Sequence, residues 1–355
     1  MIRYGVLAPV LLALLVPSVP VRAADVDAAA DAAADAAAGA GAGKPSDTAI
    51  GVAPVQVATG PEMPGVLVPL ARTRLHLDCR GEPGLGTVLF EAGLGGNALE
   101  WEDVRERLHA RLGPGVRTCA YDRGGYGWSD PIAGTRDAAR LAAELDTLLR
   151  RAGIDGPLVP VAHSFGGFVA RLLIERRGGR VAGLVLVDAS HERQFERLSV
   201  AGGRSMLPGR GPFFLSRPPL PDNLPASVRP RIEAFSRLRK TYSATHGEMA
   251  GFGVSAGQAG AARSARAAAG PAWHMPLVVV RRGRQLYANG AEDAVGRDKD
   301  AGWAELQEDL ARLSTRGRTV VAETSGHHVH VDQPGLVADV IVQVLDAART
   351  VAEGG

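Results

Sequence analysis

From about residue 66 onward, short apolar runs alternate with segments of helical periodicity, and this alternation constrains the fold more than any other feature. The apolar runs are continuous and rich in Val and Leu, which is typical of parallel strands buried on both faces. In segment 138–152, Leu141, Leu145 and Leu148 recur at three- and four-residue spacing and form one apolar face. The pattern predicts an α/β fold, a mostly parallel sheet with helices on both faces. The expected strands are 74–79, 87–91, 116–121, 158–163, 181–188, 277–282 and 318–323, and the expected helices are 98–112, 138–152, 165–177, 303–314 and 336–351.

Segment 191–272 breaks this rhythm. It has no clear strand, many prolines and two candidate helices, at 226–242 and 257–269. An insertion of this size between two strands predicts a helical cap over one edge of the sheet. The cap divides the core into a first part, 50–190, and a second part, 273–355.

The N-terminus has the pattern of a secretory signal. Arg3 precedes an apolar run at 6–16, and small residues precede a cleavage position after Ala23. The run is shorter than the roughly 20 residues of a membrane span, so residues 1–23 are interpreted as a signal peptide, with an uncleaved anchor as the alternative. Residues 24–49, rich in Ala, Gly and Asp, are interpreted as a flexible tether. The protein is therefore expected in the periplasm or outside the cell.

Composition excludes some partners. The chain has 355 residues, a net charge of +2 and scattered arginines with no basic stripe, so no nucleic-acid partner is expected. Neither a metal nor a cofactor is expected, because the histidines near residue 327 lack accompanying carboxylate or thiolate ligands. The two cysteines, Cys79 and Cys119, are compatible with a disulfide or with two buried thiols.

The sequence VAHSFGG at 161–167 follows an apolar strand and precedes a helical run. This is the context of a nucleophile elbow, a tight strand-to-helix turn that exposes a serine, here Ser164. Small residues two positions before and after the serine allow the close backbone approach, and Ala162 and Gly166 meet that need. Pro160 lacks a ladder donor, so irregular pairing is expected there.

A glycine-rich loop, EAGLGGN at 91–97, follows another buried strand. Such a loop can direct a backbone N–H toward a substrate carbonyl oxygen. The N–H of Phe165, just after the serine, is the expected second donor of an oxyanion hole.

The candidate base is His327, which follows the last strand, with His328 and His330 as competitors; Gly326 favours His327 by freeing the preceding backbone. The candidate acid is Asp188, at the carboxyl end of the strand after the elbow helix. The later carboxylates Asp293 and Glu292 stay open as alternatives.

The motifs EAGLGG, YDRGGYGWSD, AHSFGG, LVLVDASH and SGHHVHVDQP occur in an order that resembles the α/β-hydrolase superfamily, over about residues 66–348. The resemblance is strongest to esterase-like bacterial serine hydrolases. It implies eight strands with a cap inserted after the sixth, Ser164 as nucleophile, His327 as base, and the N–H groups of Leu94 and Phe165 as oxyanion donors. The usual acid of the family follows the seventh strand, where this chain has none; some members place it after the sixth, which Asp188 fits. The resemblance also makes the strands of the two cysteines neighbours, which favours a disulfide.

The expected reaction is hydrolysis of a small-molecule carboxylic ester through an acyl-enzyme. A serine nucleophile argues against epoxide hydrolysis and dehalogenation, which need a carboxylate at the elbow. Amide, lactone or C–C bond hydrolysis and perhydrolysis are alternatives on the same residues. Because fold alone does not define function, a catalytically inactive binding module and a surface-tethered structural protein are alternatives of other classes.

Overall fold

The computed structural model describes residues 63–132, 134, 136–199, 220–270, 272–290 and 292–353. The predicted signal peptide (1–23) and tether (24–49) lie outside these residues.

Eight strands form one sheet in the order β1-β2-β4-β3-β5-β6-β7-β8. Strand β2 runs antiparallel to its neighbours β1 and β4, and all the other pairs are parallel. The predicted eight-stranded, mostly parallel sheet is therefore confirmed. The strands are β1 (Val66–Leu70), β2 (Thr73–Arg80), β3 (Thr87–Glu91), β4 (Arg117–Tyr121), β5 (Leu158–His163), β6 (Leu184–Val187), β7 (Trp273–Arg282) and β8 (Ser314–Ala322).

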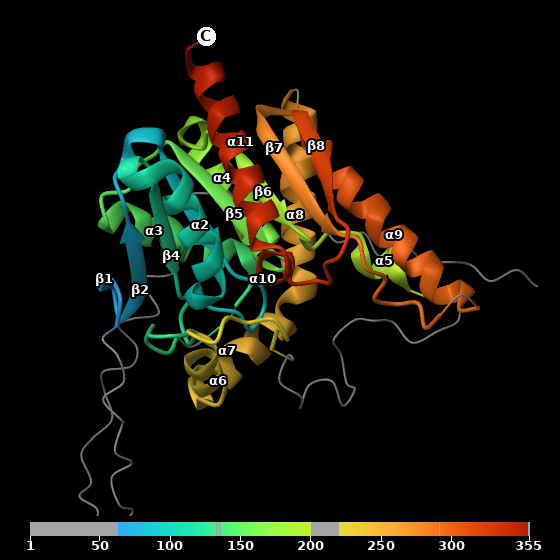
Figure 1. Cartoon of the computed structure of the whole chain (residues 1–355), viewed down its shortest axis with the longest axis horizontal. Helices are drawn as coiled ribbons and strands as arrows, with labels where there is room; N and C mark the ends of the chain where they lie inside the picture. Colours follow the sequence, from blue (N-terminus) through green and yellow to red (C-terminus); the bar gives the residue numbers. More distant parts are fainter. Residues whose placement is uncertain are drawn as a thin grey trace, which may run out of the picture. The chain divides into compact units, whose positions relative to one another are not determined.

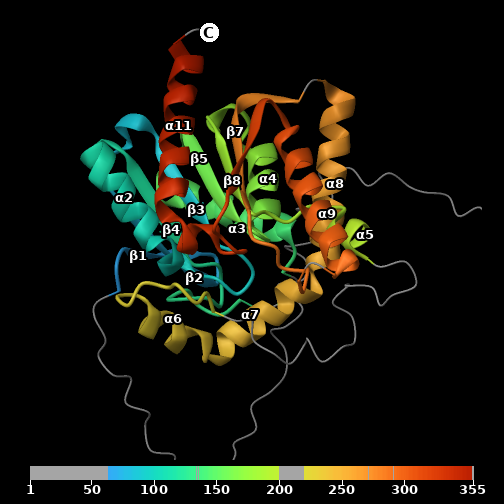
Figure 2. The same ribbon diagram turned by 45° about the vertical axis from the view of Figure 1, so that its right-hand side comes forward.

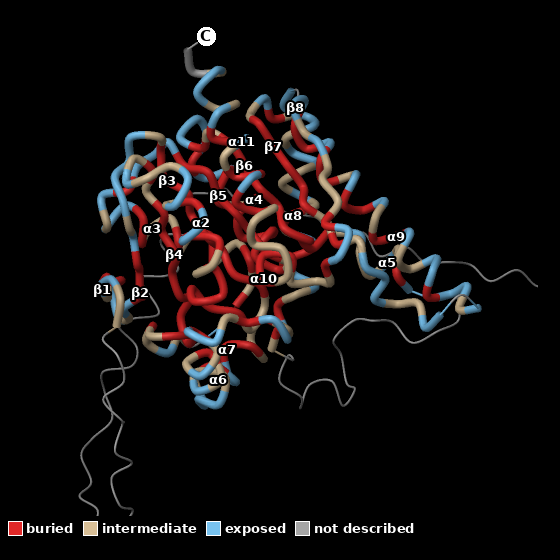
Figure 3. Tube along the Cα trace, in the orientation of Figure 1, coloured by how far each residue is buried: buried red, intermediate tan, exposed pale blue. Residues whose placement is uncertain are grey.

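Helices cover both faces of the sheet (Figures 1 and 2). On one face, alternate strand residues such as Leu89 and Leu186 pack with the helices α3, α4 and α8 (Phe252–Ala269) and with the end of α9. On the other face, residues such as Phe90 and Val187 pack with α2 and α11. The buried stretches therefore follow the strands through the middle of the layers (Figure 3). The helices are α2 (Glu102–Leu112), α3 (Ala138–Arg151), α4 (Gly166–Arg177), α9 (Ala294–Ala311), α10 (Val329–Asp332) and α11 (Pro334–Glu353).

Helix α3 illustrates how local sequence sets these boundaries. The Asp137 side chain accepts a hydrogen bond from the N–H of Arg140, which caps the first turn. The helix ends before Gly153, whose φ of +67° suits glycine. The predicted apolar face, including Leu141, Leu145 and Leu148, is buried against the sheet.

Two predicted boundaries near the C-terminus are wrong. The helix expected at 303–314 begins at residue 294, with Asp293 as its cap, and ends at residue 311. Ser314 already belongs to β8, because this strand extends along the full length of β7. Mixed polarity over 314–319 hid the strand, since several of its side chains are exposed or half-buried.

The segment between β6 and β7 contributes helices and, within its described residues, no strand. Its helices are α5 (Gln194–Leu198), α6 (Arg229–Ser236), α7 (Arg239–Ala250) and α8 (Phe252–Ala269). Helices α6 and α7 lie beyond one end of the strands, while α8 runs back along the sheet (Figures 1 and 2).

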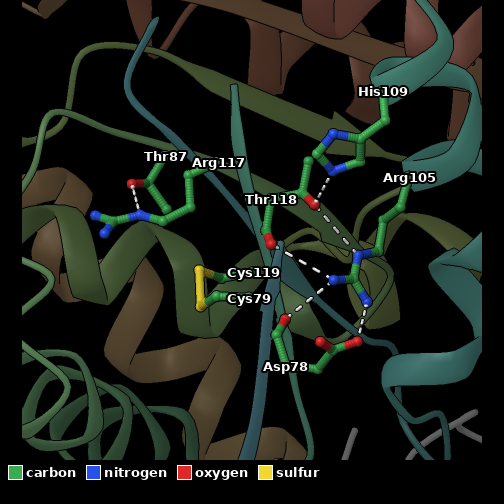
Figure 4. The surroundings of a disulfide bond; sticks show 8 residues. All are labelled: Asp78, Cys79, Thr87, Arg105, His109, Arg117, Thr118 and Cys119. Carbon is green, nitrogen blue, oxygen red and sulfur yellow. Dashed lines mark hydrogen bonds and ion pairs between the residues drawn. A yellow bond between two sulfur atoms is a disulfide. The ribbon is translucent and has the colours of Figure 1, made fainter. Parts of the chain in front are cut away.

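A disulfide joins Cys79 of β2 to Cys119 of β4, as the resemblance implied. The two residues are direct partners in the antiparallel ladder. Next to the bond, Arg105 of α2 donates to Asp78 at 2.7 Å, which ties the helix to the same strand (Figure 4). Together these contacts fix β2 to the parallel part of the sheet.

Among the described residues, no helix is both long enough and apolar enough to cross a membrane.

Candidate active site

Ser164 occupies the turn between β5 and α4. Its φ is +49°, a left-handed conformation that is uncommon for a residue with a side chain. The ends of the turn are fixed by hydrogen bonds from Ser164 N to Val187 O, 3.1 Å, and from Ser190 N to Ser164 O, 2.9 Å. The strained turn is therefore held by the end of β6. Pairing near Pro160 is irregular as expected only on the β6 side, where the regular ladder begins at Val161. On the β3 side Pro160 pairs in register with Leu89.

Close backbone packing surrounds this turn. A β-carbon on Gly166 would lie 2.6 Å from the carbonyl oxygen of Ala92, so only glycine fits there. A β-carbon on Gly93 would lie 2.6 Å from Nδ1 of His163 and 3.2 Å from the β-carbon of Ser164. The glycine-rich loop thus passes directly over the serine.

Asp188 follows β6 and also has a positive φ, +41°. Its carboxylate is fully buried. Oδ1 accepts hydrogen bonds from the N–H of Arg282, 3.1 Å, and from the indole N–H of Trp303, 2.8 Å, and Oδ2 accepts one from the Arg282 guanidinium, 2.9 Å. Burial alone would raise the pKa of Asp188, but the hydrogen bond with His327 and the charge of Arg282 lower it to about 2. The carboxylate is therefore ionised at neutral pH.

His327 bridges the two groups. Its Nδ1 lies 2.7 Å from Oδ2 of Asp188, and its Nε2 lies 2.9 Å from Oγ of Ser164. Because Asp188 is ionised and can only accept, Nδ1 carries the proton and Nε2 is free to accept from the serine hydroxyl. The three residues form a continuous hydrogen-bonded chain, the arrangement by which a base can activate a serine hydroxyl.

Two backbone N–H groups remain free beside Ser164. Among the described residues, neither Leu94 nor Phe165 donates its backbone N–H to a protein acceptor. Leu94 belongs to the loop above the serine, and Phe165 directly follows the serine at the start of α4. Unpaired donors on both sides of a serine are the requirement for an oxyanion hole.

A buried ion-pair network lies behind the glycine-rich loop. The Arg123 guanidinium donates to the carbonyl oxygens of Ala92 and Gly93, both at 2.7 Å. It also pairs with Glu91 at 2.6 Å and with Glu248 of α7 at 2.9 Å. Burial raises the pKa of Glu91 to about 7, even with Arg123 beside it. The network fixes the position of the loop and connects it to α7.

Three further histidines surround His327. The ring of His163 lies 4.6 Å from that of His327 between centroids, and its Nε2 lies 3.0 Å from the His327 carbonyl oxygen. Burial and then the neighbouring histidine rings lower the pKa of His163 well below its usual range. Burial and His327 likewise lower the pKa of His328 to about 3. His330 is fully buried and stacks on Trp101 at 4.3 Å. We conclude that His163 and His328 are neutral at physiological pH.

The other sequence candidates lie elsewhere. Asp293 caps α9, where its carboxylate accepts from the N–H groups of Gly296, 2.8 Å, and Asn289, 3.0 Å. Neither Asp293 nor Glu292 contacts His327 within the described residues. His328 and His330 contact neither Ser164 nor Asp188 by any hydrogen bond in the same part of the chain.

A cavity of about 50 Å³ lies beside the glycine-rich loop and the elbow. The core contributes the loop 93–96, Glu100, His163 and His328 to its lining, and α6 and α7 contribute Ser236, Thr241, Tyr242, Thr245 and His246. Sequence reasoning missed Glu100 and His163. Only the position of His163 directly before the serine could have drawn attention to it.

A family model described as "Alpha/beta hydrolase family" matches residues 88–340. The chain belongs to the α/β hydrolase family. This membership confirms the predicted superfamily and identifies the chain as a hydrolase of that family.

Relatives of this α/β hydrolase are similar over different lengths. An uncharacterised protein of Schizosaccharomyces pombe is 30% identical over 142 residues, which cover 34% of this chain and 26% of that one. The chain thus spans about a quarter of that relative's length. The uncharacterised protein YqjL of Bacillus subtilis is 25% identical over 270 residues, 76% of this chain and 87% of that one. Lipase LipV of Mycobacterium tuberculosis is 36% identical over 117 residues, 32% of this chain and 41% of the lipase.

Solved structures share the fold. A thermophilic esterase from Thermogutta terrifontis superimposes with a TM-score of 0.53 at 21% identity, covering 79% of this chain and 97% of the esterase. A candidate epoxide hydrolase from Pseudomonas aeruginosa gives a TM-score of 0.56 at 17% identity, covering 82% and 99%. At these identities the likeness concerns the fold alone.

Proposed function

We propose that this α/β hydrolase is an exported serine hydrolase that cleaves a carboxylic ester of a small molecule through an acyl-enzyme. The observation that carries the proposal is the continuous hydrogen-bonded chain from Ser164 through His327 to the ionised Asp188, with distances of 2.9 and 2.7 Å. An ester is the first choice because a lipase, 36% identical over 117 residues, is among the similar proteins.

The reaction follows from the positions of these groups. Oγ of Ser164 attacks the ester carbonyl carbon while Nε2 of His327 takes its proton. Asp188 keeps the proton of the imidazole on Nδ1 and stabilises the imidazolium. The N–H groups of Leu94 and Phe165 bind the oxyanion, and His327 then protonates the leaving alcohol. Water, activated by the same histidine, hydrolyses the acyl-Ser164 ester and restores the free enzyme.

The helical segment 191–272 is proposed to act as the cap of this site. Residues of α6 and α7 line the same cavity as the glycine-rich loop and His163 of the elbow. Glu248 of α7 also pairs with Arg123, which holds that loop. A substrate would therefore lie between the core and these two helices.

Hydrolysis of p-nitrophenyl acetate and butyrate by the purified protein tests the catalytic proposal. The wild type should release p-nitrophenol, and Ser164→Ala should lower kcat by about 10⁴-fold or more, as removal of such a nucleophile does. A fluorophosphonate probe should label the wild type but not Ser164→Ala. Absence of turnover and of labelling in a folded wild-type protein would exclude the proposal.

Export is proposed from the signal pattern of residues 1–23 and is supported by the disulfide. Expression of the full chain in a bacterium, followed by mass spectrometry of the periplasmic fraction, should yield a chain that begins at Ala24. Recovery of the uncut chain in the membrane fraction would favour the uncleaved anchor instead.

A further inference from the structure

One buried carboxylate beside the site has no function in the proposed reaction. Glu100 is 6% exposed and belongs to the turn Ala98–Trp101 that follows the glycine-rich loop. Its carboxylate lies against Gly96, where a β-carbon would come within 2.7 Å of Oε2. Glu100 therefore reaches the cavity from the side of the oxyanion loop.

The carboxylate has no hydrogen-bond donor among the described residues. Nε2 of His330 lies 3.6 Å from Oε2 of Glu100, which is beyond hydrogen-bond distance. A buried carboxylate without a donor is costly, so such groups are usually paired or bind a ligand. The nearest donor among the described residues is therefore His330, whose two ring nitrogens are buried and have no hydrogen-bond partner of their own. This single long contact leaves Glu100 able to accept from a group in the cavity.

The charge of the cavity matches a cation. Glu100 is the only carboxylate among the described lining residues, and these residues include no lysine or arginine. Most carboxylates near the cavity are neutralised by arginines, as Glu248 is by Arg123 and Arg136. Glu100 lacks such a partner within the described residues.

The hydroxyl groups of the cavity are arranged as acceptors. Ser236, Thr241 and Thr245 each donate their hydroxyl proton to a backbone carbonyl oxygen, at 2.8, 3.2 and 2.8 Å. Toward a ligand these oxygens can only accept, and the oxygen of Thr245 already accepts from the Tyr126 hydroxyl at 3.3 Å. The ring of Tyr242, which lies 4.1 Å from that of His246 between centroids, adds aromatic surface of the kind that attracts cations.

We propose that the substrate ester carries a small ammonium group and that Glu100 binds this group, which makes Glu100 a specificity-determining residue. A cavity of about 50 Å³ has room for a compact substituted ammonium. This inference rests on the proposed ester hydrolysis by Ser164.

A matched pair of esters tests the inference. 2-(Dimethylamino)ethyl acetate is protonated at pH 7, and 3-methylbutyl acetate is its neutral isostere, with CH in place of the protonated nitrogen. Acetate release from both esters is measured, and the rate with Ser164→Ala is subtracted as the blank. In the wild type, kcat/KM should be at least about 10-fold higher for the ammonium ester than for the neutral ester. Glu100→Gln should reduce this ratio of the two kcat/KM values by about 10- to 100-fold, which corresponds to the loss of one hydrogen bond to a charged group.

Glu102→Gln is the matched control. Glu102 lies two residues away, pairs with Arg80 at 2.6 Å and does not line the cavity. This variant should keep the wild-type ratio. If Glu100 only paired with His330 as a structural element, Glu100→Gln would lower kcat/KM equally for both esters. The ratio of the two values would then be unchanged, which would overturn the inference.

A second measurement uses the wild type alone, so that it stands even if Glu100→Gln fails to fold. 2-(Dimethylamino)ethanol should inhibit hydrolysis of p-nitrophenyl acetate with a Ki at least about 10-fold lower than that of 3-methylbutanol. Equal Ki values would overturn the inference while leaving the serine hydrolase proposal intact. Absence of p-nitrophenyl acetate hydrolysis would instead contradict the proposed function itself.

Discussion

Arg123 and Glu248 form a two-point ion pair that is closed off from solvent. Nε of Arg123 lies 2.9 Å from Oε1 of Glu248, and Nη2 lies 2.9 Å from Oε2. The arginine belongs to the segment after β4 and the glutamate to α7, which are 125 residues apart in sequence. Because the same guanidinium holds the carbonyl oxygens of Ala92 and Gly93, this pair links α7 to the proposed oxyanion loop.

Glu248→Gln should therefore destabilise the protein by about 3–5 kcal/mol, because it leaves the charge of Arg136 without its buried partner. Urea unfolding followed by circular dichroism measures this change. Glu175→Gln is the control, since Glu175 pairs with Arg266 at the surface and such pairs contribute about 1 kcal/mol or less. Equal losses in both variants would contradict the structural importance of the buried pair.

Asp188→Asn should lower kcat for p-nitrophenyl acetate by about 10³–10⁴-fold, since an amide cannot hold His327 in the required tautomer. Asp293→Asn should leave kcat close to the wild-type value, because its carboxylate caps a helix and asparagine is also a favourable cap. Steady-state kinetics of both variants identifies the acid. The opposite ranking would assign that role to Asp293.

Gly93→Ala should lower kcat by about 10²-fold. The added β-carbon would lie 2.6 Å from the His163 ring and 3.2 Å from the β-carbon of Ser164, so the loop that offers the Leu94 N–H must shift. Gly253→Ala is the matched control in α8, where the β-carbon meets no atom within 4 Å. This second change should leave kcat unaltered and stabilise the protein by about 0.5–1 kcal/mol.

The neutral His328 predicts an acid-sensitive fold. An unfolded histidine has a pKa near 6.5, whereas the pKa of His328 in the folded protein is about 3. Below pH 6.5 the unfolded chain therefore binds the extra proton, and the free energy of unfolding falls as the pH falls. Between pH 6.0 and 4.5 the wild type should lose about 1–2 kcal/mol more than His328→Asn. Parallel pH dependences in the two proteins would contradict a depressed pKa.

The disulfide closes a loop between residues separated by 40 positions. Replacing Cys79 and Cys119 together with serine should lower the free energy of unfolding by about 3–4 kcal/mol, mainly because the unfolded chain gains freedom. Thermal unfolding with and without reductant checks this value. Reductant should shift the wild type toward the double variant and leave the double variant unchanged.

Local patterns in the sequence were sufficient for most of the fold. Continuous apolar runs identified the strands of the parallel sheet, and the small residues around Ser164 identified the strained turn. The strands at the sheet edges were harder to define. β1 was missed because it is short and partly exposed, and β8 was shortened because its first residues are polar.

The sequence predicted those residues of the site that follow a strand, because the strands themselves could be recognised. Ser164 and Asp188 come directly after β5 and β6, and His327 lies in the loop after β8, so topology alone placed them near one another. The groups that hold Asp188 come from distant segments, since Arg282 and Trp303 lie 94 and 115 residues further along the chain. The spacing of residues in the sequence does not reveal contacts that arise only when β7 and α9 pack against the rest of the core. For the same reason the sequence did not show that Glu100 lines the cavity.

The position of Asp188, the proposed acid, after β6 has a consequence for how this enzyme can diversify. Ser164 and Asp188 follow the neighbouring strands β5 and β6, in which His163 pairs with Val187. The relative positions of the two residues are therefore set by a part of the chain that ends before residue 191. If the segment between β6 and β7 sets substrate choice, as proposed, its sequence can change without altering this relation. Such changes must keep the packing of α8 on the sheet and the pair between Glu248 and Arg123, so α6 is the part of the segment in which new selectivity can be introduced with the same chemistry.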